Sequence, residues 1–132
     1  MAGEQILVVE DNNKNMKLLR DVLQATGYRT LEASTGEQAL TLATEHRPAL
    51  VLMDIRLPDM DGVEALHRLR MDERTASIPV LAVTAQAMKG DSERFKEAGF
   101  DGYVSKPVDI DELLTTVEQH CGGAAGNRRA RS

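Results

Sequence analysis

Three continuous apolar runs constrain the fold of this chain more than any other feature. They span Ile6–Val9, Leu50–Met53 and Val80–Val83, and none of them alternates with polar residues. A short apolar run that ends in polar or turn residues is typical of a strand buried on both faces, as in a parallel sheet. The sequence therefore predicts a central sheet that is covered by helices on both sides.

A segment with apolar residues at helical spacing follows each predicted strand. The last such segment carries Leu113, Leu114 and Val117 on one stripe. Residues that favour a helix N-cap precede four of these segments: Asn12, Ser34 or Thr35, Asp61, and Asp109 or Asp111. Strands that alternate with helices in this way predict an α/β fold with a parallel sheet and right-handed crossovers.

Two weaker segments complete the predicted sheet. Tyr28–Ala33 alternates, with Leu31 and Ala33 on one side, which is typical of an edge strand. Tyr103–Val104 forms a short fifth strand that ends before Pro107. With these two strands at the edges, the simplest arrangement is a flavodoxin-like, doubly wound sheet of five strands in the order 2-1-3-4-5, with five helices.

Composition limits the kinds of partner that this chain can have. Its 132 residues suit one domain, which we expect over residues 1–121, followed by a flexible basic tail over 122–132. The net charge of −5 disfavours direct binding of nucleic acid. The single cysteine and the lack of an apolar run near the roughly 20 residues of a membrane span predict a cytoplasmic protein without membrane insertion.

Polar side chains follow four of the predicted strands, at the point where each strand ends. Glu10 and Asp11 follow the first strand, Asp54 ends the third, Thr84 ends the fourth, and Lys106 follows the fifth. Alone, a carboxylate in such a place is usually a helix cap or a solvated strand end. Because the carboxyl ends of parallel strands meet at one edge, where ligand crevices form, the four together predict a functional site.

The charges of this predicted site indicate its chemistry. The three carboxylates and one ammonium group sum to a formal charge of −2, which a divalent cation would offset. Carboxylate oxygens, without histidine or cysteine, favour Mg²⁺ or Mn²⁺ over Zn²⁺. An aspartate oxygen can attack phosphorus, and Lys106 and the Thr84 hydroxyl could stabilise the transferring group.

Four motifs in this order resemble the receiver domain of bacterial two-component response regulators. They are Leu7–Asn12, Leu52–Gly62, Val83–Ala85 and Ser105–Pro107, and the resemblance covers about residues 5–120. The segment Ala87–Asp91 is most similar to stand-alone cell-division receivers of alphaproteobacterial type. Receivers of hybrid sensor kinases share much of this pattern.

The resemblance implies a role for each residue at the strand ends. Asp54 would be the phosphoacceptor, and Asp11, Asp54 and the backbone carbonyl of Arg56 would bind Mg²⁺, with Glu10 acting mainly through water. Lys106 would be the phosphoryl-binding lysine, joined to Pro107 by a cis peptide bond. Thr84 would be the switch hydroxyl and Tyr103 the switch aromatic residue.

The same resemblance implies a signalling partner on each side of the reaction. A histidine kinase or a histidine phosphotransfer protein would donate the phosphoryl group. A downstream protein would bind the face formed by the fourth helix, the fifth strand and the fifth helix. The protein would catalyse only its own phosphorylation and slow dephosphorylation, and it would turn over no metabolite.

Three other interpretations remain open at this stage. A flavodoxin-like electron carrier shares the fold, but it would need a phosphate-binding loop where this chain has Glu10–Lys14. A phosphohydrolase with an aspartate nucleophile typically has a second aspartate two residues later, where this chain has Arg56. The chain could also be a receiver cut from a hybrid kinase or a longer regulator.

Overall fold

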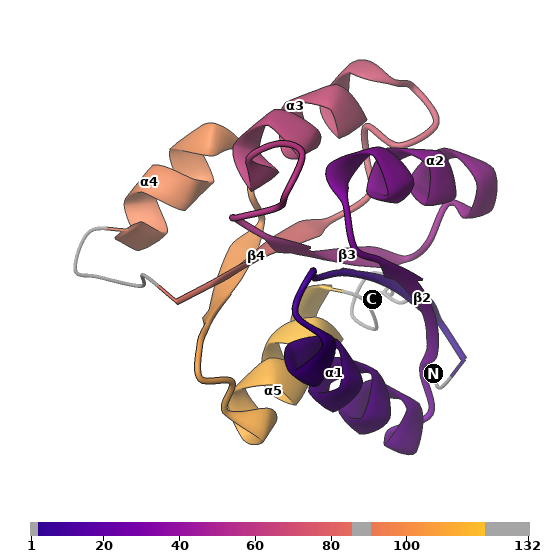
Figure 1. Cartoon of the computed structure of the whole chain (residues 1–132), viewed down its shortest axis with the longest axis vertical. Coiled ribbons are helices and arrows are strands. Elements are labelled where there is room, and N and C mark those ends of the chain that lie inside the picture. The colour runs from indigo at the N-terminus through magenta and orange to yellow at the C-terminus, as the bar shows by residue number, and fades with distance from the viewer. Residues whose placement is uncertain (1–2, 86–90, 121–132) are drawn as a thin grey trace.

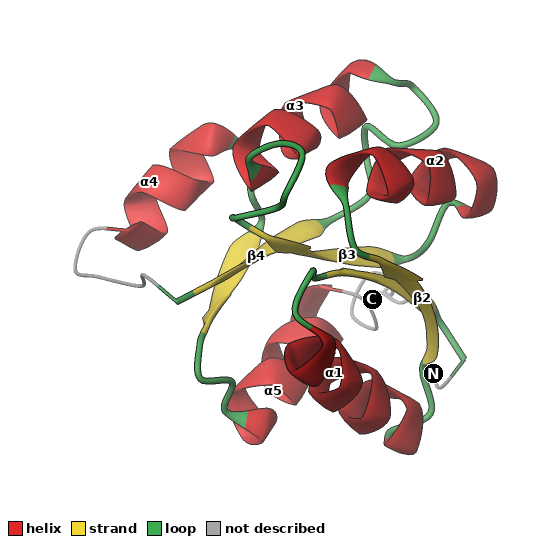
Figure 2. Cartoon of the chain, viewed as in Figure 1, coloured by secondary structure: helices red, strands yellow, loops and turns green. Residues whose placement is uncertain are grey.

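The computed structural model describes residues 3–85 and 91–120 and contains one parallel sheet between two layers of helices (Figures 1 and 2). Its strands lie in the order β2-β1-β3-β4-β5, which confirms the predicted fold and topology. The strands are β1 (Gln5–Val9), β2 (Arg29–Ala33), β3 (Leu50–Asp54), β4 (Val80–Thr84) and β5 (Gly102–Ser105).

The helices divide between the two faces of the sheet. Figure 1 shows α1 (Asn13–Ala25) and α5 (Ile110–His120) together on one face. The other face carries α2 (Gly36–His46), α3 (Gly62–Met71) and α4 (Asp91–Ala98). Helices cover β1, β3 and β4 on both sides, so successive residues of each strand point into two different hydrophobic cores. Both faces of these strands are therefore buried, which explains why polar residues do not alternate with apolar ones in their sequences.

Side-chain caps begin the helices largely where the sequence predicts them. Asn12 accepts a hydrogen bond from the backbone of Asn15, and Asp61 accepts one from Val63. Thr35 caps α2, and Asp109 caps α5 by accepting from the backbone N–H of Glu112 at 3.0 Å. The choice between Asp109 and Asp111 is therefore settled in favour of Asp109.

The strand register brings the predicted site residues together. Val9 of β1 pairs with Met53 of β3, so the next residue of each strand lies at the same edge. These next residues are Glu10 and Asp54. In β4 and β5, Thr84 pairs with Ser105, which places Lys106 just beyond the end of the sheet.

A glycine allows the first turn of α3 to lie directly against the end of β3. The backbone N–H of Gly62 donates to the carbonyl of Ile55 at 2.7 Å. A Cβ atom at Gly62 would lie 2.6 Å from the carbonyl oxygen of Asp54 and 2.9 Å from Cα of Ile55. Both neighbours are backbone atoms, so the close packing around Asp54 requires glycine here.

Some predictions concern residues outside the described ranges. The flexible tail over 122–132 and most of the Ala87–Asp91 motif belong to this group. Within residues 3–85 and 91–120, the structure has no helix with the length and apolar character that membrane crossing demands.

Candidate functional site

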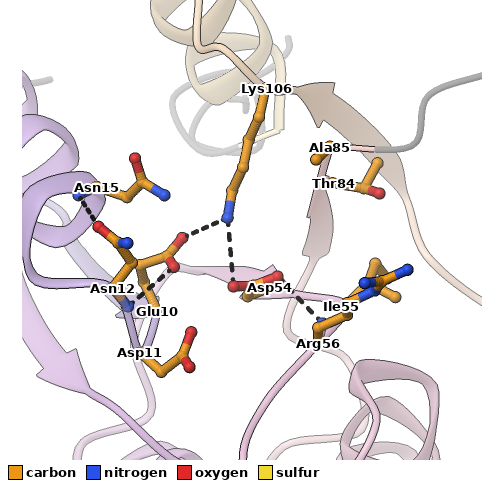
Figure 3. A pocket seen from close by; sticks show the side chains of 10 residues that line it. All are labelled: Glu10, Asp11, Asn12, Asn15, Asp54, Ile55, Arg56, Thr84, Ala85 and Lys106. Atoms are coloured by element: carbon orange, nitrogen blue, oxygen red, sulfur yellow. Dashed lines mark hydrogen bonds and ion pairs between the residues drawn. The ribbon is translucent and has the colours of Figure 1, made fainter.

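A cavity of about 300 Å³ opens at the carboxyl edge of the sheet, between the loops that follow β1, β3, β4 and β5 (Figure 3). We call it the acidic cavity. It is lined by Glu10, Asp11, Asn12, Asn15, Asp54, Ile55, Arg56, Thr84, Ala85 and Lys106. The structure therefore brings all the charged and hydroxyl residues predicted at the strand ends into one cavity.

Lys106 extends into this cavity from the loop after β5 and contacts two carboxylates (Figure 3). Its Nζ atom lies 2.9 Å from Oε1 of Glu10 and 3.3 Å from Oδ2 of Asp54. The second oxygen of Asp54 accepts a hydrogen bond from the backbone N–H of Arg56 at 3.1 Å. Asp54 is thus held at both oxygens, and only 6% of its surface is exposed.

Burial and neighbouring charges shift the pKa values of two groups in the acidic cavity. Burial raises the pKa of Glu10, and the nearby Asp54 carboxylate raises it further, while the Lys106 ammonium partly offsets both effects. Burial alone would lower the pKa of Lys106, but the carboxylates of Glu10 and Asp54 outweigh it and raise the pKa above its usual value. Lys106 therefore stays charged at neutral pH.

Three carboxylates of the acidic cavity lie close enough together to share one cation. Glu10, Asp11 and Asp54 can each offer an oxygen, and these oxygens lie within 4.8 Å of one another. Glu10 and Asp54 are buried, whereas Asp11 is exposed to solvent. A set of hard oxygen donors with excess negative charge fits Mg²⁺ or Mn²⁺.

Two polar lining residues of the acidic cavity, Asn12 and Asn15, were not predicted as site residues. Asn12 was expected only as a helix cap, yet its backbone N–H also donates to Oε2 of Glu10 at 3.2 Å. Asn15 lies in the first turn of α1 and donates its backbone N–H to the Asn12 side chain. The sequence signal for Asn15 was its position three residues after the predicted cap Asn12, which itself follows Glu10 and Asp11.

The two predicted switch residues lie at different distances from the cavity. Thr84 lines it and is 4% exposed. Tyr103 is half-buried on β5, and its ring packs against Phe95 of α4 with the centroids 5.8 Å apart. Tyr103 thus joins β5 to α4, one strand beyond Thr84. The peptide bond between Lys106 and Pro107 is cis, as the resemblance implies.

A comparison with protein families identifies the family of this chain. The family described as the response regulator receiver domain matches residues 6–118. The chain belongs to this family. Receiver domains in general act as phosphorylation-dependent switches of two-component signalling.

Relatives of this receiver domain include single-domain response regulators. The polar-differentiation response regulators DivK of Brucella anthropi and Brucella ovis are each 46% identical over 121 residues, with 92% of this chain and 98% of the relative covered. This similarity agrees with the predicted resemblance to alphaproteobacterial cell-division receivers.

Solved structures show the same receiver fold. The receiver domain of the Pseudomonas aeruginosa sensor histidine kinase PA1611 has a TM-score of 0.84 and 37% identity, and the match covers 92% of this chain and 99% of that chain. That structure holds a magnesium ion in its active-site cleft. The Vibrio cholerae chemotaxis protein CheY4 has a TM-score of 0.83 and 27% identity, with coverages of 90% and 99%.

Proposed function

We propose that this receiver domain accepts a phosphoryl group on Asp54 from a histidine kinase or a histidine phosphotransfer protein. The observation that carries this proposal is the position of the Asp54 carboxylate, 3.3 Å from Nζ of Lys106 in the acidic cavity. A carboxylate held beside a fixed positive charge and open to a cavity is oriented for attack on an incoming phosphoryl group.

The transfer exchanges one bond to phosphorus for another. An oxygen of Asp54 attacks the phosphorus atom of a phosphohistidine, the phosphorus–nitrogen bond breaks, and the imidazole leaves with the electron pair. Negative charge spreads over the phosphoryl oxygens during this step. Lys106 lies where its ammonium group can stabilise that charge, and the Thr84 hydroxyl can donate a hydrogen bond to a phosphoryl oxygen.

The same cavity would hold the metal ion of the reaction. Asp11, Asp54 and the backbone carbonyl of Arg56 would bind Mg²⁺, or Mn²⁺ in its place, and Glu10 would act mainly through water. The magnesium ion in the similar receiver of Pseudomonas aeruginosa supports this assignment. The cation would offset the charge of −2 that otherwise repels a phosphoryl donor.

The phosphorylated form would differ from the free form in its protein-binding surface. Thr84 would be drawn toward the phosphoryl group, and Tyr103 would change its position on the face formed by α4, β5 and α5. A downstream protein would read that change. The proposal places the protein in the cytoplasm and gives it no activity beyond its own phosphorylation and slow dephosphorylation.

The charge of the acidic cavity disfavours the electron-carrier alternative. A flavin mononucleotide carries a phosphate group, and the buried carboxylates of Glu10 and Asp54 would repel it. No feature of the described residues favours flavin binding over phosphoryl transfer.

The experiment that tests this proposal is intact-protein mass spectrometry after incubation with acetyl phosphate. We expect one phosphoryl adduct in the presence of Mg²⁺ and none after EDTA is added. The matched control is Asp54→Asn, which keeps the size of the side chain and removes the nucleophilic carboxylate. An adduct of unchanged yield on Asp54→Asn would contradict the assignment.

A further inference from the structure

Asp59 makes a contact that links the loop after Asp54 to a different helix. This loop, residues 55–61, joins β3 to α3 and includes Arg56. Oδ1 of Asp59 accepts a hydrogen bond from the backbone N–H of Gly36 at 2.8 Å, and Oδ2 accepts one from Glu37 at 3.0 Å. Both donors lie in the first turn of α2, more than twenty residues earlier in the chain.

Helix α2 does not depend on Asp59 for its own cap. Thr35 already caps it, because the hydroxyl oxygen of Thr35 accepts a hydrogen bond from the backbone N–H of Gln38 at 3.1 Å. The N–H groups of Gly36 and Glu37 come earlier in the helix and have no acceptor within it. Asp59 accepts from both, so its carboxylate anchors the loop to α2 from outside the helix.

A second contact fixes the loop against the same turn of α2. A Cβ atom at Gly36 would lie 2.5 Å from Cγ of Met60, so the side chain of Met60 occupies the space that glycine leaves open. On its other side the loop closes on itself through the Gly62–Ile55 hydrogen bond and a backbone bridge between Arg56 and Asp61. The loop therefore has little freedom to shift while Asp59 remains bonded.

We propose that Asp59 is a positioning residue for the acidic cavity, since it holds the β3–α3 loop in the place that the metal site requires. The inference rests on the proposed function, in which the carbonyl of Arg56 is a metal ligand. The N–H of Arg56 also bonds to Oδ1 of Asp54, so a shift of the loop would move a metal ligand and loosen the phosphoacceptor together. Asp59 acts through the backbone and touches neither the cation nor the phosphoryl group.

The test is a calorimetric titration of purified variants of the 132-residue chain with Mg²⁺ alone. Asp59→Ala removes both acceptor oxygens, and we expect its dissociation constant for Mg²⁺ to rise about three- to tenfold. This is less than the roughly 10–100-fold typical of groups bonded directly to a ligand, because Asp59 acts one step further away. The phosphorylation rate with acetyl phosphate at low Mg²⁺ should fall by a similar factor and recover at saturating Mg²⁺.

Thr35→Ala is the matched control. It weakens the N-terminus of the same helix but leaves the anchor of the loop intact, so we expect its Mg²⁺ affinity to equal that of the wild type. Asp59→Asn keeps one acceptor oxygen, so we expect an Mg²⁺ affinity between those of Asp59→Ala and the wild type. If Asp59→Ala does not fold, Asp59→Asn takes its place in the comparison. Wild-type affinity in folded Asp59→Ala and Asp59→Asn, or an equal loss in Thr35→Ala, would overturn the inference.

A reference variant separates this inference from the proposed function. Asp11→Ala removes a proposed metal ligand and should lose most Mg²⁺ binding. Unchanged binding by Asp11→Ala, or no binding by the wild type, would overturn the metal site and the role of Asp59 with it. Loss in Asp11→Ala together with wild-type affinity in both Asp59 variants would overturn the role of Asp59 alone.

Discussion

The ammonium nitrogen of Lys106 lies 3.3 Å from Oδ2 of Asp54, across the carboxyl edge of the sheet. The two residues are 52 positions apart in the chain and meet because β3 and β5 both end beside β4. Lys106 also pairs with the buried Glu10, so without a metal ion it is the positive charge that offsets two carboxylates in the acidic cavity.

Lys106→Ala should therefore destabilise the metal-free protein and impair phosphoryl transfer. Removing one partner of a fully buried ion pair costs about 3–5 kcal/mol. Because water reaches part of Lys106, we expect a loss of about 1–2 kcal/mol in the free energy of unfolding, measured by urea denaturation in EDTA. Lys106→Arg keeps the charge and should recover most of this stability, whereas equal stability of Lys106→Ala and the wild type would contradict the ion-pair account.

Gly62→Ala should cost more stability than Gly36→Ala. A Cβ atom at Gly62 meets backbone atoms of Asp54 and Ile55, which cannot move without shifting the end of β3. At Gly36 the neighbour is the flexible side chain of Met60, which can change rotamer. We expect a loss of about 1–3 kcal/mol for Gly62→Ala, as for other overpacked sites, and a smaller loss for Gly36→Ala. Denaturant unfolding of both variants checks the order, and the reverse order would refute it.

The stabilising effect of Asp59 should depend on pH. Hydrogen bonds from the backbone of Gly36 and Glu37 lower the pKa of Asp59 from its ordinary value of 3.8. A lowered pKa in the folded state gives stability that is present above the unfolded-state pKa and is lost as the pH falls below it. The difference in melting temperature between the wild type and Asp59→Asn should therefore be larger near neutral pH than at about pH 3. A difference that stays constant or grows on acidification would contradict this assignment.

The sequence predicted the strand order and the cavity residues because both depend on strong local signals. Unbroken apolar runs mark β1, β3 and β4, and each polar residue that ends such a run must lie at the same edge of a parallel sheet. The alternating Tyr28–Ala33 segment was less well defined, and β2 begins at Arg29, one residue later than predicted.

The contacts between loops could not be predicted in the same way. The hydrogen bonds from Gly36 and Glu37 to Asp59 depend on how two loops meet after the sheet has formed. Local sequence does not indicate which helix the Asp59 side chain contacts. The choice of Asp109 over Asp111 as the cap of α5 likewise depends on backbone geometry rather than on residue type.

The structural effect of phosphorylation at Asp54 should reach Tyr103 through Thr84. Thr84 lines the acidic cavity at the end of β4. Tyr103 lies on the neighbouring strand β5, and its ring packs against Phe95 of α4. Beryllofluoride, a mimic of the phosphoryl group, should shift backbone amide NMR signals in both the cavity loops and the α4–β5–α5 face. A ligand can bias such a change only through contacts that differ between the two states.

Two variants of Thr84 test this relay. Thr84→Ser retains the hydroxyl and should keep the shifts of Phe95 and Tyr103, whereas Thr84→Ala should confine the shifts to the loops around Asp11, Asp54 and Lys106. Shifts at Phe95 and Tyr103 that persist unchanged in Thr84→Ala would show that the signal reaches this face by another route.

The most direct measurement of the central claim is chemical trapping of the phosphorylated residue. Borohydride reduces an acyl phosphate to an alcohol and would convert a phosphorylated aspartate into homoserine at its place in the chain. After incubation with acetyl phosphate and Mg²⁺, peptide mass spectrometry should find homoserine at position 54, and EDTA should abolish it. Homoserine at position 11 instead of 54, or a phosphoryl adduct that yields no homoserine at all, would contradict Asp54 as the acceptor.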